Sequence, residues 1–96
     1  MELNNKQKKY LKGLAHNLNP VVMVGNNGIN DGVLKEIETT LEAHELIKIR
    51  IRCEGQEELK PLVDDIAQKV NATLVQVLGH SVTLYRQGKE PKINLP

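Results

Sequence analysis

The chain has 96 residues, 40% of them hydrophobic, and a net charge of +1 at pH 7. These values predict one packed domain rather than a disordered chain, and no apolar stretch approaches the roughly 18 residues that span a membrane. The single cysteine, Cys53, cannot form an internal disulfide, and no apolar run of a signal peptide follows the N-terminal lysines. We therefore expect a cytoplasmic protein.

The first predicted element is a helix over residues 5–18. Asn4 or Asn5 can cap its start, and Asn19-Pro20 ends it, because a residue before proline avoids the α region. Its apolar residues form one stripe at helical spacing: Tyr10, Leu11, Leu14, Ala15 and Leu18. Its basic side chains and its histidine lie largely off that stripe: Lys8, Lys9, Lys12 and His16.

The next two elements flank a glycine-containing turn. Residues 21–24 are all apolar, which predicts a strand that is central or buried on both faces. The run ends in Gly25-Asn26-Asn27-Gly28. Asn30 and Asp31 then cap a second predicted helix that extends to about residue 44.

Residues 46–53 show the alternation of a half-buried strand. Three isoleucines and Cys53 face one way, which predicts that the cysteine is an unreactive core residue. The opposite face carries three bases and no acid: Lys48, Arg50 and Arg52. The plain alternative is that these cations merely form a solvated strand face.

The rest of the chain completes a predicted α/β (α+β) domain. A third helix extends to about Val70, with Pro61 in its first turn or at a kink, and strands over 73–78 and 81–86 are joined by Gly79-His80. Residues 87–96 lack an apolar period and are expected to be loosely held. The order α-β-α-β-α-β-β predicts a mixed four-stranded sheet.

The turn Gly25-Asn26-Asn27-Gly28 is the principal candidate site. Glycines let a ligand approach the backbone, and a following helix start attracts phosphate. KH domains clamp a nucleic-acid backbone with such a G-x-x-G loop. The alternative from pattern alone is that the four residues form only a turn.

Topology predicts that basic residues gather around this turn. If the first helix returns directly into the first strand, then Lys6, Lys8 and Lys9 lie near the turn. If the second strand is parallel to the first, Arg50 and Arg52 reach the same edge of the sheet. Three basic segments distant in the sequence would then surround one glycine turn.

Three segments of the chain resemble the CRM domain (chloroplast RNA splicing and ribosome maturation) of the stand-alone bacterial YhbY type, over about residues 4–86. They are NKQKKYLKGLAHNLNPVVMVGNNGINDGVLKEI, ELIKIRI and GHSVTLYR. The resemblance implies a fold like the C-terminal domain of initiation factor three and association with precursors of the large ribosomal subunit. It also implies RNA contact through the G-x-x-G loop and nearby basic residues.

The sequence therefore predicts an RNA-binding protein whose partner is ribosomal RNA, with no enzymatic activity, cofactor, metal, membrane or small-molecule ligand. Tyr10 and Tyr85 are the only aromatic residues, so the chain lacks an aromatic platform for unpaired bases, and contact with phosphates of structured or double-stranded RNA is expected. His16 is equally compatible with helix packing. The alternatives are an adapter that docks proteins on the acidic helix faces, or a small enzyme. The expected RNA-binding residues are Lys6, Lys8, Lys9, Lys12, His16, Gly25, Asn26, Asn27, Gly28, Lys48, Arg50, Arg52 and Arg86.

Overall fold

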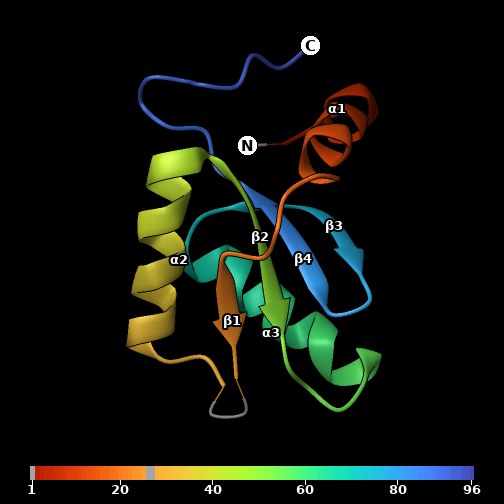
Figure 1. Cartoon of the computed structure of the whole chain (residues 1–96), viewed down its shortest axis with the longest axis vertical. Coiled ribbons are helices and arrows are strands. Elements are labelled where there is room, and N and C mark those ends of the chain that lie inside the picture. The colour runs from red at the N-terminus through yellow and green to blue at the C-terminus, as the bar shows by residue number, and fades with distance from the viewer. Residues whose placement is uncertain (1, 26–27) are drawn as a thin grey trace.

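The computed structural model, which describes residues 2–25 and 28–96, has the predicted order of helices and strands (Figure 1). The prediction of a mixed four-stranded sheet is confirmed, and most element boundaries lie within two residues of the predicted ones. The elements are α1 (Asn5–Ala15), β1 (Val22–Val24), α2 (Asp31–His44), β2 (Leu46–Ile51), α3 (Gln56–Lys69), β3 (Thr73–Leu78) and β4 (Ser81–Tyr85).

The sheet has the strand order β1-β2-β4-β3. As predicted, β1 is parallel to β2, and β3 and β4 form an antiparallel hairpin. The prediction that β1 is central or buried on both faces is wrong, because β1 is an edge strand. Val22 and Val24 are buried, whereas the side chain of Met23 is 63% exposed on the opposite face.

The two faces of the sheet are covered to different extents. Helices α2 and α3 pack on one face, where Ile37, Leu41 and Ile66 are fully buried against the isoleucines of β2. Helix α1 packs on the other face at one end only, where Leu11 and Ala15 meet Leu46, Val75 and Tyr85. The part of this second face near the ends of β1 and β2 is therefore open (Figure 1).

Helix α1 is shorter than predicted. Its start is fixed by a capping box, in which the Asn4 side chain accepts a hydrogen bond from the Gln7 backbone at 2.8 Å, and the Gln7 side chain accepts one from the Asn4 backbone at 3.1 Å. The helix ends at Ala15, three residues before the predicted end, so the apolar stripe continues into the connection to β1. In α3, Pro61 lies inside the helix, beyond its first turn.

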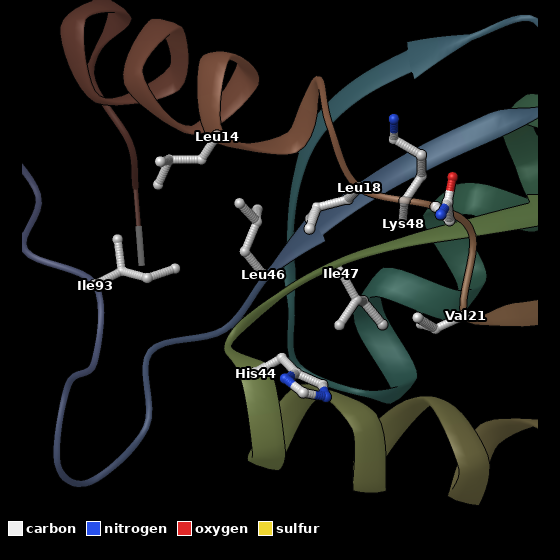
Figure 2. Close-up of a pocket in the computed structure, with 9 residues that line it drawn as sticks. Leu14, Leu18, Val21, His44, Leu46, Ile47, Lys48 and Ile93 are labelled. Atoms are coloured by element: carbon white, nitrogen blue, oxygen red, sulfur yellow. The ribbon is translucent and has the colours of Figure 1, made fainter.

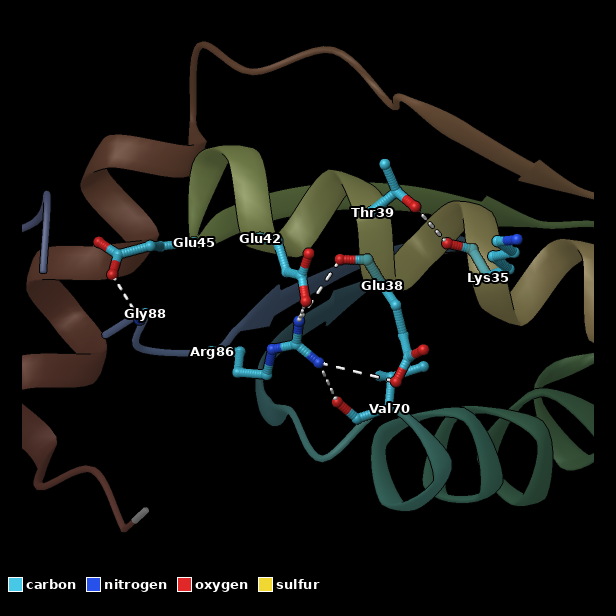
Figure 3. Close-up of polar contacts among 8 residues, drawn as sticks. All are labelled: Lys35, Glu38, Thr39, Glu42, Glu45, Val70, Arg86 and Gly88. Atoms are coloured by element: carbon cyan, nitrogen blue, oxygen red, sulfur yellow. Dashed lines mark hydrogen bonds and ion pairs between the residues drawn. The ribbon is translucent and has the colours of Figure 1, made fainter. Parts of the chain in front are cut away.

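The C-terminal segment, residues 87–96, is attached to the body of the protein, contrary to the expectation of a loosely held tail. Its anchor is Glu45, which is 1% exposed and adopts a positive φ of 64° directly after α2. The carboxylate accepts backbone hydrogen bonds from Gly88 at 2.6 Å (Figure 3), from Lys92 at 2.7 Å and from Ile93 at 3.0 Å. Ile93 and Leu95 also pack against the buried residues under α1.

Candidate functional site

The carboxyl ends of β1 and β2 bring Gly25, Gly28 and Arg52 together. Met23 lies opposite Arg50 in the parallel register, and the Arg52 N–H donates to the Val24 carbonyl at 2.8 Å. Gly25, Gly28 and Arg52 line one cavity of about 570 Å³, together with two acids, Glu54 and Glu58. The predicted placement of Arg52 beside the glycine turn is thus confirmed, and Arg50 lies at the same end of β2, opposite Met23.

Gly25 and Gly28 leave space for a ligand. The Gly28 N–H donates to the Gly25 carbonyl at 3.0 Å, and Gly28 has a φ of +76°, a left-handed conformation that favours glycine. A Cβ atom added at either glycine would meet no atom within 4 Å. The predicted site residues Asn26 and Asn27 lie outside the described residues. A phosphate could therefore approach the backbone closely at both glycines.

The start of α2 is less suited to phosphate than the sequence suggested. The Asn30 side chain already accepts a hydrogen bond from the Val33 N–H at 2.9 Å, and Asp31 occupies the first turn. The cap uses one of the donors at the helix start, and the carboxylate of Asp31 repels anions. Phosphate contact therefore depends more on the glycine turn and the adjacent arginines than on the helix.

The cationic face of β2 is present as predicted. Arg50 and Arg52 are exposed and Lys48 is half-buried. Across residues 2–25 and 28–96, the ion pairs involve other residues, so none of these three cations is neutralised by an acid. Their charges are thus available to an anionic partner.

The cations of α1 divide into two groups. Because Leu11 and Ala15 cover Leu46 and Tyr85, α1 crosses the end of the sheet that is remote from the glycine turn (Figure 1). The prediction that Lys6, Lys8 and Lys9 lie near the glycine turn is therefore wrong. Nearer the open face, Lys12 and His16 border a cavity of about 290 Å³ with Lys48, Gln76 and Leu78.

Arg86 does not belong to the predicted basic surface. Its guanidinium donates to the Val70 carbonyl at 2.9 Å and lies 3.8 Å from Glu38 and 3.7 Å from Glu42 (Figure 3). The side chain therefore joins the C-terminal end of α3 to α2, on the face opposite Arg50. An arginine engaged in this way has a structural role, so Arg86 is not among the residues proposed below to contact RNA.

A third cavity, of about 360 Å³, lies between α1, the start of β2 and the C-terminal segment (Figure 2). Leu14, Leu18 and Val21 line it and are 41%, 37% and 49% exposed, and Ile93 contributes from the C-terminal segment. These residues include part of the predicted apolar stripe of the first helix. A mainly aliphatic lining makes this cavity unsuited to phosphate.

Cys53 is only partly buried, in contrast to its predicted core position. β2 ends at Ile51, so the alternation that placed the cysteine in the core stops before it. The side chain packs against the edge of the core, and its Sγ lies 3.4 Å from the Gly55 carbonyl oxygen, which accepts its hydrogen bond. The residue also lines the cavity beside Gly25 and Gly28.

Metal clusters and membrane-spanning helices are both absent from the described part of the chain. Residues 2–25 and 28–96 contain no group of three or more histidine, cysteine, aspartate or glutamate side chains placed to hold a metal ion. The same residues contain no helix that is both long and apolar enough to cross a membrane.

The comparisons with known proteins agree on one family. The model of the CRS1 / YhbY (CRM) domain matches residues 3–86. A Haemophilus influenzae protein named "RNA-binding protein" is 49% identical over 94 residues, which cover 98% of this chain and 95% of that protein. A Bacillus subtilis protein named "Probable RNA-binding protein YqeI" is 38% identical over 95 residues, covering 98% and 99%.

The fold is also similar to a solved structure. The solution structure of the hypothetical protein SAV1595 from Staphylococcus aureus superposes with a TM-score of 0.86 at 40% sequence identity. The match covers 99% of this chain and 100% of the other.

Proposed function

Because the chain belongs to the CRS1 / YhbY (CRM) domain family, we propose that it binds RNA by its phosphate backbone, at Gly25, Gly28 and the adjacent cations. The observation that carries this proposal is the position of Arg50 and Arg52, exposed and without ion pairs to described acids, beside two glycines whose backbone is open to a ligand. Arginine binds phosphate through paired N–H donors, and glycine lets the backbone approach it. Relatives named as RNA-binding proteins support the same reading.

The proposed RNA is ribosomal, in immature large subunits in the cytoplasm, and the protein acts by binding rather than by catalysis. Support for this finer part comes from the resemblance to the YhbY type. Sedimentation of a cell extract at low salt tests it, and we expect the protein in the fractions of immature large subunits. If it stays at the top of the gradient, the ribosomal assignment fails, whereas binding of purified RNA remains a separate measurement.

The contact at the glycine turn can be tested without straining the fold. Gly25 does not have a positive φ, and its added Cβ meets no atom within 4 Å, so Gly25→Val should leave the melting temperature unchanged. If phosphate approaches this backbone, the bulky side chain should weaken RNA binding by about tenfold, because a lost charge-assisted hydrogen bond costs roughly 1.5 kcal/mol or more. Fluorescence anisotropy with labelled RNA measures the affinity.

A matched variant separates contact from turn geometry. Gly28→Ala places a Cβ at a φ of +76° and should lower stability by about 1 kcal/mol through backbone strain. If the turn makes no contact with RNA, Gly25→Val should bind RNA with the same affinity as the natural chain.

A further inference from the structure

A single row of side chains crosses the open face of the sheet. In the strand register, Met23 lies opposite Arg50, Arg50 opposite Ser81, and Ser81 opposite Leu78. Each of the four strands thus contributes one residue to this row, the open row: Met23, Arg50, Ser81 and Leu78. The neighbouring row consists of Lys48, Thr83 and Gln76.

The open row leaves two large apolar side chains in solvent. Met23 is 63% exposed and Leu78 is 66% exposed, one on each side of the cationic Arg50. Helices α2 and α3 pack on the other face, and α1 covers only the far end of this one (Figure 1). The row thus holds two exposed apolar side chains and a cation on one face of the sheet, where a partner can pack against them.

The charges around the row indicate an anionic occupant. Both rows consist of cationic and neutral residues, with Arg50 inside the open row and Lys48 at the β2 end of the neighbouring row. Glu54 and Glu58 line the same cavity as Gly25, Gly28 and Arg52, and their carboxylates would repel phosphates inside it. A strand of RNA held at Gly25 is therefore directed over the open sheet rather than toward α3.

The row also has the dimensions and chemistry for unpaired bases. Neighbouring strands lie about 4.8 Å apart, so the row spans roughly 14 Å. Other RNA-binding four-stranded sheets stack two or three bases on a surface of this kind, usually through aromatic side chains. Here Tyr85 is fully buried, and arginine and methionine supply the surfaces that pack against base faces.

The cavity bordered by Lys12 and His16 adjoins the row. Its volume is about 290 Å³, and Lys12, His16, Lys48 and Gln76 line it together with Leu78. Lysine and glutamine side chains supply donors, and glutamine also an acceptor, which suits the edge of a base. The open face therefore offers both a surface for base faces and groups for base edges.

We propose that the open row binds unpaired nucleotides next to the phosphates held at Gly25 and Gly28, so that the preferred RNA is a duplex with an adjoining single-stranded segment. The inference rests on the proposed RNA binding and narrows the earlier expectation of structured or double-stranded RNA. It assigns base contact to Met23, Arg50 and Leu78, and base-edge contact to the cavity beside them.

The test compares two RNAs, a blunt hairpin and the same hairpin with a short single-stranded extension. The natural protein should bind the extended hairpin at least about tenfold more tightly, as base stacking on protein side chains predicts. The double variant Met23→Ser/Leu78→Ser should bind the extended hairpin only as tightly as the blunt one, with its affinity for the blunt one unchanged. The control Val77→Ser alters β3 on the α3 side and should keep the preference.

The possible outcomes distinguish this inference from the proposed function. Equal affinity of the natural protein for both hairpins, or a preference that persists in the double variant, would overturn the inference while RNA binding stands. A double variant that loses affinity equally for both hairpins would also overturn it. If the natural protein binds neither hairpin, the proposed function itself fails. Circular dichroism melting of each variant shows that the compared proteins are folded.

Discussion

The double substitution Arg50→Gln/Arg52→Gln is expected to weaken RNA binding by roughly 100-fold at low salt. Each arginine is exposed and unpaired among the described residues, so its loss removes a charge-assisted phosphate contact worth about 1.5 kcal/mol, or about tenfold. The slope of log affinity against log salt should also flatten by roughly 1.4–1.8 units, because two fewer counterions are released. Fluorescence anisotropy over a range of salt concentrations measures both quantities.

The double variant Lys8→Gln/Lys9→Gln is the matched control, since it removes the same charge from the opposite end of the sheet. Screening over about 10 Å at 0.1 M salt should limit its effect to a few-fold. Folding should survive in both variants, because exposed charges contribute about 0–1 kcal/mol. Equal losses in the two variants would mean that overall charge, rather than the position beside Gly25 and Gly28, determines binding.

Replacement of Glu45 with glutamine should destabilise the fold by about 2 kcal/mol, since buried backbone donors would lose a charged acceptor. For a domain of this size the melting temperature should fall by roughly 8–16 °C. The control Glu36→Gln changes an exposed residue of α2 and should stay within about 0.5 kcal/mol. Thermal denaturation followed by circular dichroism compares the two variants with the natural chain.

The same residue makes stability depend on pH. Burial alone would raise the pKa of Glu45, but hydrogen bonds from Gly88, Lys92 and Ile93 and the charge of Lys92 outweigh it, so the pKa lies below its ordinary value of 4.5. The stabilisation is therefore fully present above pH 4.5 and is lost as the pH falls through the lower folded-state pKa. Glu45→Gln should remove this component. An unchanged acid titration of stability in the variant would contradict the anchoring role.

Local sequence patterns were sufficient for most of the fold. Apolar periodicity and the caps Asn4 and Asn30 define the starts of α1 and α2, and the alternation of residues 46–53 places Arg50 on the open face. The position of Arg52 beside Gly25 followed from one topological assumption, that β1 and β2 are parallel, which the register confirms. These features depend on neighbours in the chain or on a single pairing.

The predictions about α1 and Arg86 failed because contacts between residues distant in the sequence determine their positions. The direction of α1 depends on which buried residues Leu11 covers, and no local pattern specifies Tyr85 as its partner. In the sequence Arg86 resembles any exposed cation, because its partners Glu38 and Glu42 come from α2, more than 40 residues away.

Glu45 showed no sequence signal as an anchor, because its partners are backbone N–H groups more than 40 residues away. The open row also had no signal in the sequence. Met23 read as part of an apolar strand, and only the edge position of β1 reveals that it faces solvent beside Arg50.

The most direct test of the central claim is a map of the backbone amides whose NMR signals move when RNA is added. Binding at the glycine turn and the open sheet predicts the largest shifts at Gly25, Gly28 and residues 48–52, with smaller ones near Leu78. Shifts confined to the acidic helices α2 and α3, with residues 48–52 unchanged, would contradict the account and favour a protein-docking adapter.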